Sequence, residues 1–163
     1  MEAPRKDTPD LDAFVRKVWS EGGKHHRDLA WRYIDDAYAV LVSEIMLQQT
    51  QVSRVEKYWP RFLKTFPTLD ALASADTSLV LEHWQGLGYN RRALALKRTA
   101  EECALRFEGE LPRTYDELLK LPGIGPATAG GVMAFAPAVD YYLKAHLFGD
   151  LFGRDNLAEA DRE

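Results

Sequence analysis

The stretch Leu118–Gly131, "LLKLPGIGPATAGG", predicts two helices joined by a tight turn. Gly123 and Gly125 have no Cβ, so the backbone there can take positive φ and approach a ligand closely. Pro126 suits the first position of the second helix, whose free N–H groups and positive dipole end face the turn. Ile124 is expected to anchor the turn in the core. The turn therefore predicts a site for an anionic oxygen, with a plain glycine-capped helix connection as the alternative.

Helical periodicity extends through most of the chain. An apolar stripe at i, i+3, i+4, i+7 and i+8 runs from Leu11 to Trp19, between Thr8-Pro9 and Gly22-Gly23. Thr114 and Glu117 are spaced as a capping box, and Asn90 is a plausible N-cap. No alternating strand pattern competes, so the predicted class is all-α. Helices are expected over 10–21, roughly 37–49, 52–66 with a bend at Pro60, two short segments within 67–75 and 76–88, 90–107, and 127–136.

The composition is that of an ordinary globular protein, with 46% hydrophobic and 28% charged residues. A net charge of -4 argues against a histone-like polycation, although a local basic patch could still contact DNA. The single cysteine, Cys103, excludes an intramolecular disulfide and a four-cysteine metal site within these residues. We find no signal-peptide pattern and no apolar run of membrane-spanning length, so a cytoplasmic location is expected.

A second stretch, Ser43–Val52 or "SEIMLQQTQV", places one acid in an apolar helical run. Val40, Leu41 and Leu47 lie at helical spacing around Glu44, so one side of the carboxyl should be desolvated. Desolvation raises the pKa of a carboxyl group and lets it keep a proton near neutral pH. Glu44 is therefore a candidate proton donor. The alternative is an ordinary helix acid that points into solvent.

Four segments together carry a family resemblance. "LPGIGPATAGG" resembles the helix–hairpin–helix of the HhH-GPD DNA glycosylase superfamily, which includes endonuclease III. "SEIMLQQTQV", "WQGLGYNRRA" and "RDLAWR" resemble the adenine-specific mismatch branch of that superfamily. The resemblance covers roughly Leu11 to Ala136. It implies an endonuclease III-like helical fold with the helix–hairpin–helix at about 115–136. The glycosylase core would cover 1–136, and its first helix would pack on the second lobe. The segment 137–163 is atypical and shortened, so that lobe would be incomplete.

The resemblance implies excision of adenine mispaired with 8-oxoguanine or guanine, with Glu44 protonating the flipped base. The family's second carboxylate would stabilise the sugar cation. Asp140 takes this position if the loop after Ala136 is about five residues shorter than usual; otherwise Asp140 is a simple helix N-cap. Asp150 and Asp155 are weaker candidates.

Residues that would contact DNA follow from the same resemblance. The candidates for the base pocket, the gap left by the flipped base, the intercalating wedge, the phosphates and the hairpin are Arg27, Trp31, Arg32, Gln48, Gln49, Thr50, Tyr89, Arg91, Arg92, Gly123, Ile124, Gly125 and Thr128. Core packing is the alternative for Trp31. A polar helix end is the alternative for the Gln-Gln-Thr run, and a solvated helix face for the basic run.

Bifunctional relatives carry a Schiff-base lysine two residues after the second hairpin glycine, where this chain has Ala127. A monofunctional glycosylase that leaves an abasic site is therefore expected. One cysteine cannot ligate the family's 4Fe–4S cluster, so no cofactor is expected, but the hairpin 122–125 is a candidate position for a monovalent cation. The expected partner is double-stranded DNA with a mispaired base, bound by a monomer. The alternatives are excision of U or T opposite G, a truncated non-catalytic DNA-binding homologue, and a helical interaction module.

Overall fold

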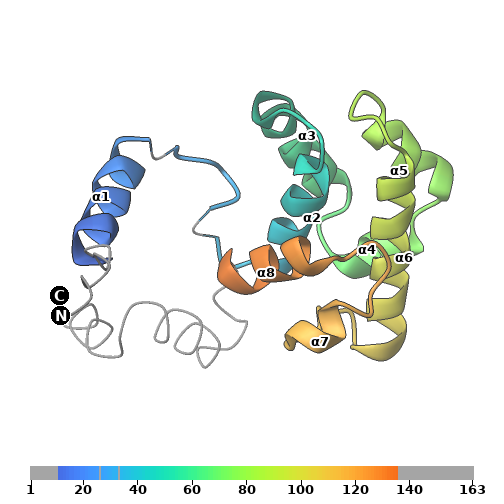
Figure 1. Cartoon of the computed structure of the whole chain (residues 1–163). Helices are drawn as coiled ribbons and strands as arrows, with labels where there is room; N and C mark the ends of the chain where they lie inside the picture. Colours follow the sequence, from blue (N-terminus) through green and yellow to red (C-terminus); the bar gives the residue numbers. More distant parts are fainter. Residues whose placement is uncertain (1–10, 26, 33, 136–163) are drawn as a thin grey trace, which may run out of the picture.

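The computed structural model describes residues 11–25, 27–32 and 34–135 of the chain. Within these ranges the regular structure is entirely α-helical, as the sequence predicted. The helices in chain order are α1 Leu11–Lys24, α2 Ala37–Leu47, α3 Val52–Thr65, α4 Leu69–Ser74, α5 Thr77–Trp84, α6 Arg91–Arg106, α7 Tyr115–Leu118 and α8 Pro126–Phe135. Figure 1 shows α2 to α8 gathered into one helical body.

α2 is the central helix of this body. It is apolar nearly all round, and Val40, Leu41, Val42, Ile45 and Met46 are all buried. A helix with no polar face must be covered on every side. α8 and α3 pack along α2, and α6 also contacts it (Figure 1). The carboxyl of any acid on α2 is therefore held close to other helices.

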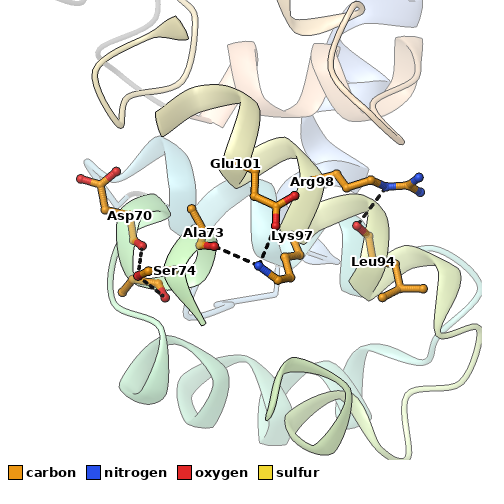
Figure 2. Close-up of polar contacts among 8 residues, drawn as sticks. Asp70, Ala73, Ser74, Leu94, Lys97, Arg98 and Glu101 are labelled. Carbon is orange, nitrogen blue, oxygen red and sulfur yellow. Dashed lines mark hydrogen bonds and ion pairs between the residues drawn. The ribbon is translucent and has the colours of Figure 1, made fainter. Parts of the chain in front are cut away.

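α4 and α6 form the most extensive helix pair of the described residues. Lys97 of α6 is buried, and its ammonium group donates to the carbonyl oxygen of Ala73 at 2.9 Å and to Oε1 of Glu101 at 2.7 Å. Figure 2 shows this arrangement beside Arg98, which is exposed and donates from Nε to the carbonyl of Leu94 at 3.3 Å. The buried charge is thus paired within the scaffold.

Two predicted helix ends are wrong. α1 continues through Gly22 and Gly23 to Lys24, beyond the predicted end at 21, and an ion pair of 2.7 Å between Lys24 and Glu21 supports its last turn. α2 ends at Leu47 rather than at residue 49, because Gln49 has φ +56°, which lies outside the right-handed helical region.

Of the two predicted helix caps, one is confirmed and one is wrong. Thr114 accepts the Glu117 N–H at 3.3 Å and donates its hydroxyl to the Glu117 carboxylate at 2.7 Å, so the predicted cap before α7 is confirmed. Asn90 has helical φ and ψ and makes no side-chain cap bond, so the predicted N-cap before α6 is wrong.

α1 lies apart from the other helices in Figure 1. Its apolar stripe is open, with Phe14 63% and Trp19 71% exposed. The packing of this helix on a second lobe stays a prediction, and the segment 137–163 lies outside the described residues.

Candidate functional site

A small cavity lies between the segment 27–32, α2 and the first residue of α3. Its volume is about 140 Å³. Both polar and apolar side chains line it: Arg27, Leu29, Trp31, Arg32, Val40, Ser43, Glu44, Leu47 and Val52. Four predicted site residues, from two segments of the sequence, therefore meet in one place: Arg27, Trp31, Arg32 and Glu44.

Glu44 is half-buried on the face of α2 that it shares with Val40 and Leu47. The backbone of α8 lies against its carboxyl group, since a Cβ added at Gly131 would lie 2.6 Å from both Cδ and Oε2 of Glu44. Among the described residues, none donates a hydrogen bond to Glu44 or forms an ion pair with it. Burial without a compensating donor raises the pKa of Glu44 above its ordinary value of 4.5. Such a carboxyl group can deliver a proton to a base bound in the cavity.

Trp31 forms a wall of this cavity and also belongs to the core. It is 4% exposed, and its ring meets the edge of Trp59 at a centroid distance of 5.9 Å. The segment around it is closed by its own bonds, because Nη1 of Arg32 donates to the carbonyl of Arg27 at 3.2 Å. Core packing and a role in the cavity are thus compatible for Trp31.

A wider depression of about 570 Å³ adjoins the small cavity. The two share Arg27, Leu29 and Val52 as lining residues, and the depression adds polar side chains, among them Gln51 and Ser53. Glu44 lines the small cavity and is not among the lining residues of the depression. The two hollows therefore lie next to each other, and the smaller one has a carboxyl group in its wall.

Two turns, 47–51 and 86–90, each carry a non-glycine residue in the left-handed region. Gln49 has φ +56° and Tyr89 has φ +50°, and both side chains are exposed, Tyr89 by 56%. Left-handed backbone is unfavourable for residues with a Cβ and persists where the surroundings enforce it. The side chain of Gln48 is instead directed inward and donates to the buried hydroxyl of Thr128 at 3.2 Å.

Arg92 requires a correction. It was predicted to contact phosphate, but it is only 7% exposed and its guanidinium faces the interior. Six acceptor oxygens from the two turns and the end of α2 surround it, and burial lowers the pKa of the guanidinium. They are the carbonyls of Ile45, Met46, Gln48, Leu87 and Gly88 and the hydroxyl of Thr50. Of the basic run on α6, Arg91 and Arg98 are exposed, whereas Arg92 and Lys97 are not.

The hairpin turn between α7 and α8 uses its two glycines differently. Gly123 has φ +77°, and a Cβ there would lie 2.7 Å from Cβ of Ala95 on α6. Gly125 does not take positive φ, contrary to the prediction, and a Cβ there would meet nothing within 4 Å. Ile124 is buried, as predicted. Gly123 thus serves a close helix contact, while the space above Gly125 is open to a ligand.

Some predicted residues cannot be placed. Asp140, Asp150 and Asp155 lie outside the described residues. In the described part of the chain, no group of three or more His, Cys, Asp or Glu side chains is arranged to hold a metal ion. Cys103 is buried, and burial raises its pKa to about 11, so its thiol is protonated at neutral pH. Over the same described ranges, no helix is both long and apolar enough to cross a bilayer.

One residue of the site, Gly131, and the burial of another, Arg92, were not recognised in the sequence. Gly131 gave no signal, since its contact with Glu44 joins helices that are distant in the sequence. The burial of Arg92 did have one, because Arg92, Leu96, Thr99 and Cys103 recur at i, i+4, i+7 and i+11 and all four are buried. The adjacent charge of Arg91 concealed this stripe.

Known proteins match this chain over most of its length. The family model described as "HhH-GPD superfamily base excision DNA repair protein" matches residues 42–159. An adenine DNA glycosylase of Mycolicibacterium smegmatis is 47% identical over 120 residues, which are 70% of this chain and 41% of that protein. The chain spans less than half of the length of each curated relative that we compared.

Solved structures share the fold. A thermostable thymine-DNA glycosylase superposes with a TM-score of 0.72 and 28% identity, over 77% of this chain and 58% of that one. Endonuclease III trapped in a covalent intermediate with DNA superposes with a TM-score of 0.68 and 21% identity, over 83% of this chain and 65% of that one. The predicted endonuclease III-like fold is confirmed.

Proposed function

The chain belongs to the HhH-GPD superfamily of base excision DNA repair proteins, and from that premise we propose that it removes adenine mispaired with 8-oxoguanine or guanine in duplex DNA. The observation that carries the proposal is Glu44, a carboxyl group without a partner among the described residues, whose pKa is raised in the wall of the small cavity. Relatives named adenine DNA glycosylase support the choice of base.

The small cavity suits a base that has left the helical stack. The flipped adenine would enter through the wider depression and lie against Trp31, with Arg27 and Arg32 at its edges. Protonated Glu44 would transfer its proton to a ring nitrogen of adenine. The base then leaves with the electrons of the glycosidic bond, and the sugar becomes an oxocarbenium ion.

The sugar cation needs a negative group and a water molecule. We assign the negative group to Asp140, which takes the position of the family's second carboxylate if the loop after Ala136 is about five residues shorter than usual. Attack of water on the cation completes hydrolysis and leaves an abasic site. Ala127, in the position of the lysine of bifunctional relatives, supports a reaction that stops there without nicking the strand.

Three exposed elements would bind the duplex. The space above Gly125, at the N-terminus of α8, suits one phosphate oxygen. Tyr89 would wedge into the stack, and Gln49 would meet the strand opposite the flipped base. We also propose a monovalent cation at 122–125, which titration of DNA affinity with potassium would test. A cytoplasmic location and a monomeric state are proposed as well, and cell fractionation and sedimentation would test them.

The test uses duplexes with A opposite 8-oxoguanine, A opposite G, and U or T opposite G, followed by alkali to reveal abasic sites. The wild-type chain should cleave the two adenine substrates. Glu44→Gln should lower the single-turnover rate by roughly 10²–10⁴-fold, the usual contribution of a general acid. Glu82→Gln, the same change at an exposed position of α5, is the matched control and should leave the rate unchanged.

Two results would contradict the proposal. Cleavage that persists in Glu44→Gln would remove Glu44 from the chemistry. Salt-dependent DNA binding by the wild type without any abasic product would instead identify a non-catalytic DNA-binding protein. Asp140→Asn, assayed on the same substrates, tests the second carboxylate: a rate equal to that of the wild type would exclude it.

A further inference from the structure

Arg92 lies between the C-terminal end of α2 and the turns 47–51 and 86–90. α2 stops at Leu47, and the last carbonyls of a helix have no partners within it. Nη1 of Arg92 donates to two of them, those of Ile45 and Met46, at 3.1 Å each, and also to the carbonyl of Gln48. A cation at this place is further favoured by the negative end of the helix dipole. The guanidinium therefore caps α2.

The other terminal nitrogen of Arg92 reaches the second turn. Nη2 donates to the carbonyls of Leu87 at 3.0 Å and Gly88 at 3.1 Å, and to the hydroxyl of Thr50 at 3.1 Å. One planar group thus joins the turn 47–51 to the turn 86–90. Lysine has a single nitrogen at its tip and cannot reproduce this fork of donors.

The two turns present the two left-handed residues. Gln49 follows directly on the Gln48 carbonyl held by Arg92, and Tyr89 follows directly on the Gly88 carbonyl. The ring of Tyr89 also lies over the guanidinium, with its centroid 5.5 Å from Cζ. Both exposed side chains are therefore positioned by the same buried group.

We propose that Arg92 is a positioning residue that holds the turns 47–51 and 86–90 in a fixed relative position. The exposed surface that these two turns form is called the reading edge, and Gln49 and Tyr89 on it would contact the strand opposite the flipped base together. The inference rests on the proposed function for its consequence in DNA recognition. Its structural part, the coupling of the two turns, can be tested without DNA.

Lys97 provides a matched control. It is also a buried cation of α6 bonded to a carbonyl of another segment, but that segment is α4 (Figure 2), which supplies none of the oxygens around Arg92. Arg92→Lys and Lys97→Met can therefore be compared within one helix. Thr50→Val, which removes one acceptor of Arg92, is a milder variant that keeps the guanidinium.

Amide hydrogen exchange of the full chain measures the coupling. The Thr50 and Leu87 N–H groups, bonded to the carbonyls of Leu47 at 3.2 Å and Trp84 at 3.0 Å, report on the two turns separately. In Arg92→Lys both amides should exchange roughly tenfold faster or more, because bonds to a charged donor are lost in both turns at once. Lys97→Met should leave both rates unchanged. Thr50→Val should speed exchange at Leu87, across the junction.

Exchange that rises in only one turn, or in neither, overturns the coupling. Exchange at Leu87 that does not change in Thr50→Val does the same, and this variant still decides the question if Arg92→Lys does not fold.

Cleavage assays then test the consequence. Arg92→Lys should lose at least about tenfold of its preference for A opposite 8-oxoguanine over A opposite G, the discrimination of one good base contact. The pH profile of the single-turnover rate should stay unchanged, since Glu44 is untouched. Retained discrimination with loosened turns overturns the proposed consequence. If the wild type cleaves no duplex, the proposed function fails, and the exchange data still decide the coupling.

Discussion

Two buried cations, five positions apart on α6, have opposite surroundings. Lys97 is paired with the carboxylate of Glu101 and one carbonyl of α4, between two regular helices. Arg92 has no carboxylate among its described partners and is held by carbonyl oxygens of two irregular turns. Each partner of Lys97 lies in a helix. Most partners of Arg92 lie in loops, or in the last turn of a helix.

The difference separates a scaffold side from a site side. On the scaffold side, between α4 and α6, the buried ammonium group of Lys97 is paired, and Leu72 and Leu96 are fully buried. On the site side, around α2, α8 and the two turns, Glu44 has no described partner and Gln49 and Tyr89 have left-handed backbone. Strain and unpaired groups that persist in a folded protein commonly mark function. Substitutions on the scaffold side should therefore alter stability, and those on the site side chemistry or binding.

The largest expected loss of stability is that of Leu72→Ala, on the scaffold side. Leu72 of α4 is 0% exposed, so truncation leaves a cavity in the core. The free energy of unfolding should fall by about 2–5 kcal/mol, measured by urea denaturation. Leu105→Ala, at an 82% exposed position of α6, is the matched control and should change it by less than about 0.5 kcal/mol. Similar losses in both variants would contradict the assigned packing.

Substitutions of the two hairpin glycines should differ in effect: one should alter stability and the other DNA binding. Gly123→Ala introduces a Cβ against Ala95 at a residue with φ +77°, and should destabilise the fold by about 1–3 kcal/mol. Gly125→Ala meets open space and should change stability by less than about 1 kcal/mol. DNA affinity should instead fall in Gly125→Ala, as measured by fluorescence anisotropy. Equal affinity for DNA would argue against a phosphate above Gly125.

A smaller effect is expected for Lys97→Met. The variant loses the hydrogen bond to the Ala73 carbonyl and an ion pair whose acid is half-exposed, so about 1 kcal/mol of stability should be lost. Arg98→Met, one residue along and exposed (Figure 2), should have almost no effect on thermal unfolding. If Arg98→Met lowers the unfolding temperature as much as Lys97→Met, the pairing of Lys97 is not what stabilises α6.

Local patterns were enough to predict much of the scaffold. Helical periodicity located α2 to α6, and the Thr114 cap and the buried Ile124 followed from residue type and spacing. Glu44 could be found because its apolar neighbours are one turn away on the same helix. These are all properties of short stretches of chain.

Long-range contacts were not predictable in this way. Arg91 and Arg92 are adjacent and chemically identical, but successive residues of a helix point about 100° apart, so only one of them faces α2. Which one does so depends on how α6 packs. The last carbonyls of α2 are likewise bound by Arg92, which is distant in the sequence. The contact of Gly131 with Glu44 is also tertiary.

The smallest expected effect on stability lies at the centre of the site. Burial raises the pKa of Glu44 above 4.5, so the folded state favours the protonated carboxyl. As pH rises from that ordinary value through the raised one, the wild type must ionise a desolvated group and loses stability, whereas Glu44→Gln does not. The variant should therefore unfold at a slightly higher temperature than the wild type at neutral pH, and the gap should close near pH 4.

Thermal unfolding of both proteins across this pH range, read by circular dichroism, measures the gap. A gap that does not depend on pH, or a Gln variant that is less stable at neutral pH, would show that the carboxyl is not held in a desolvated state. If the predicted gap is found, the carboxyl group of Glu44 has opposite effects on activity and on stability. Replacing the Glu44 carboxyl group by an amide should abolish most cleavage, because the proton donor is lost, and yet stabilise the fold at neutral pH, a combination that no scaffold residue around Lys97 is expected to show.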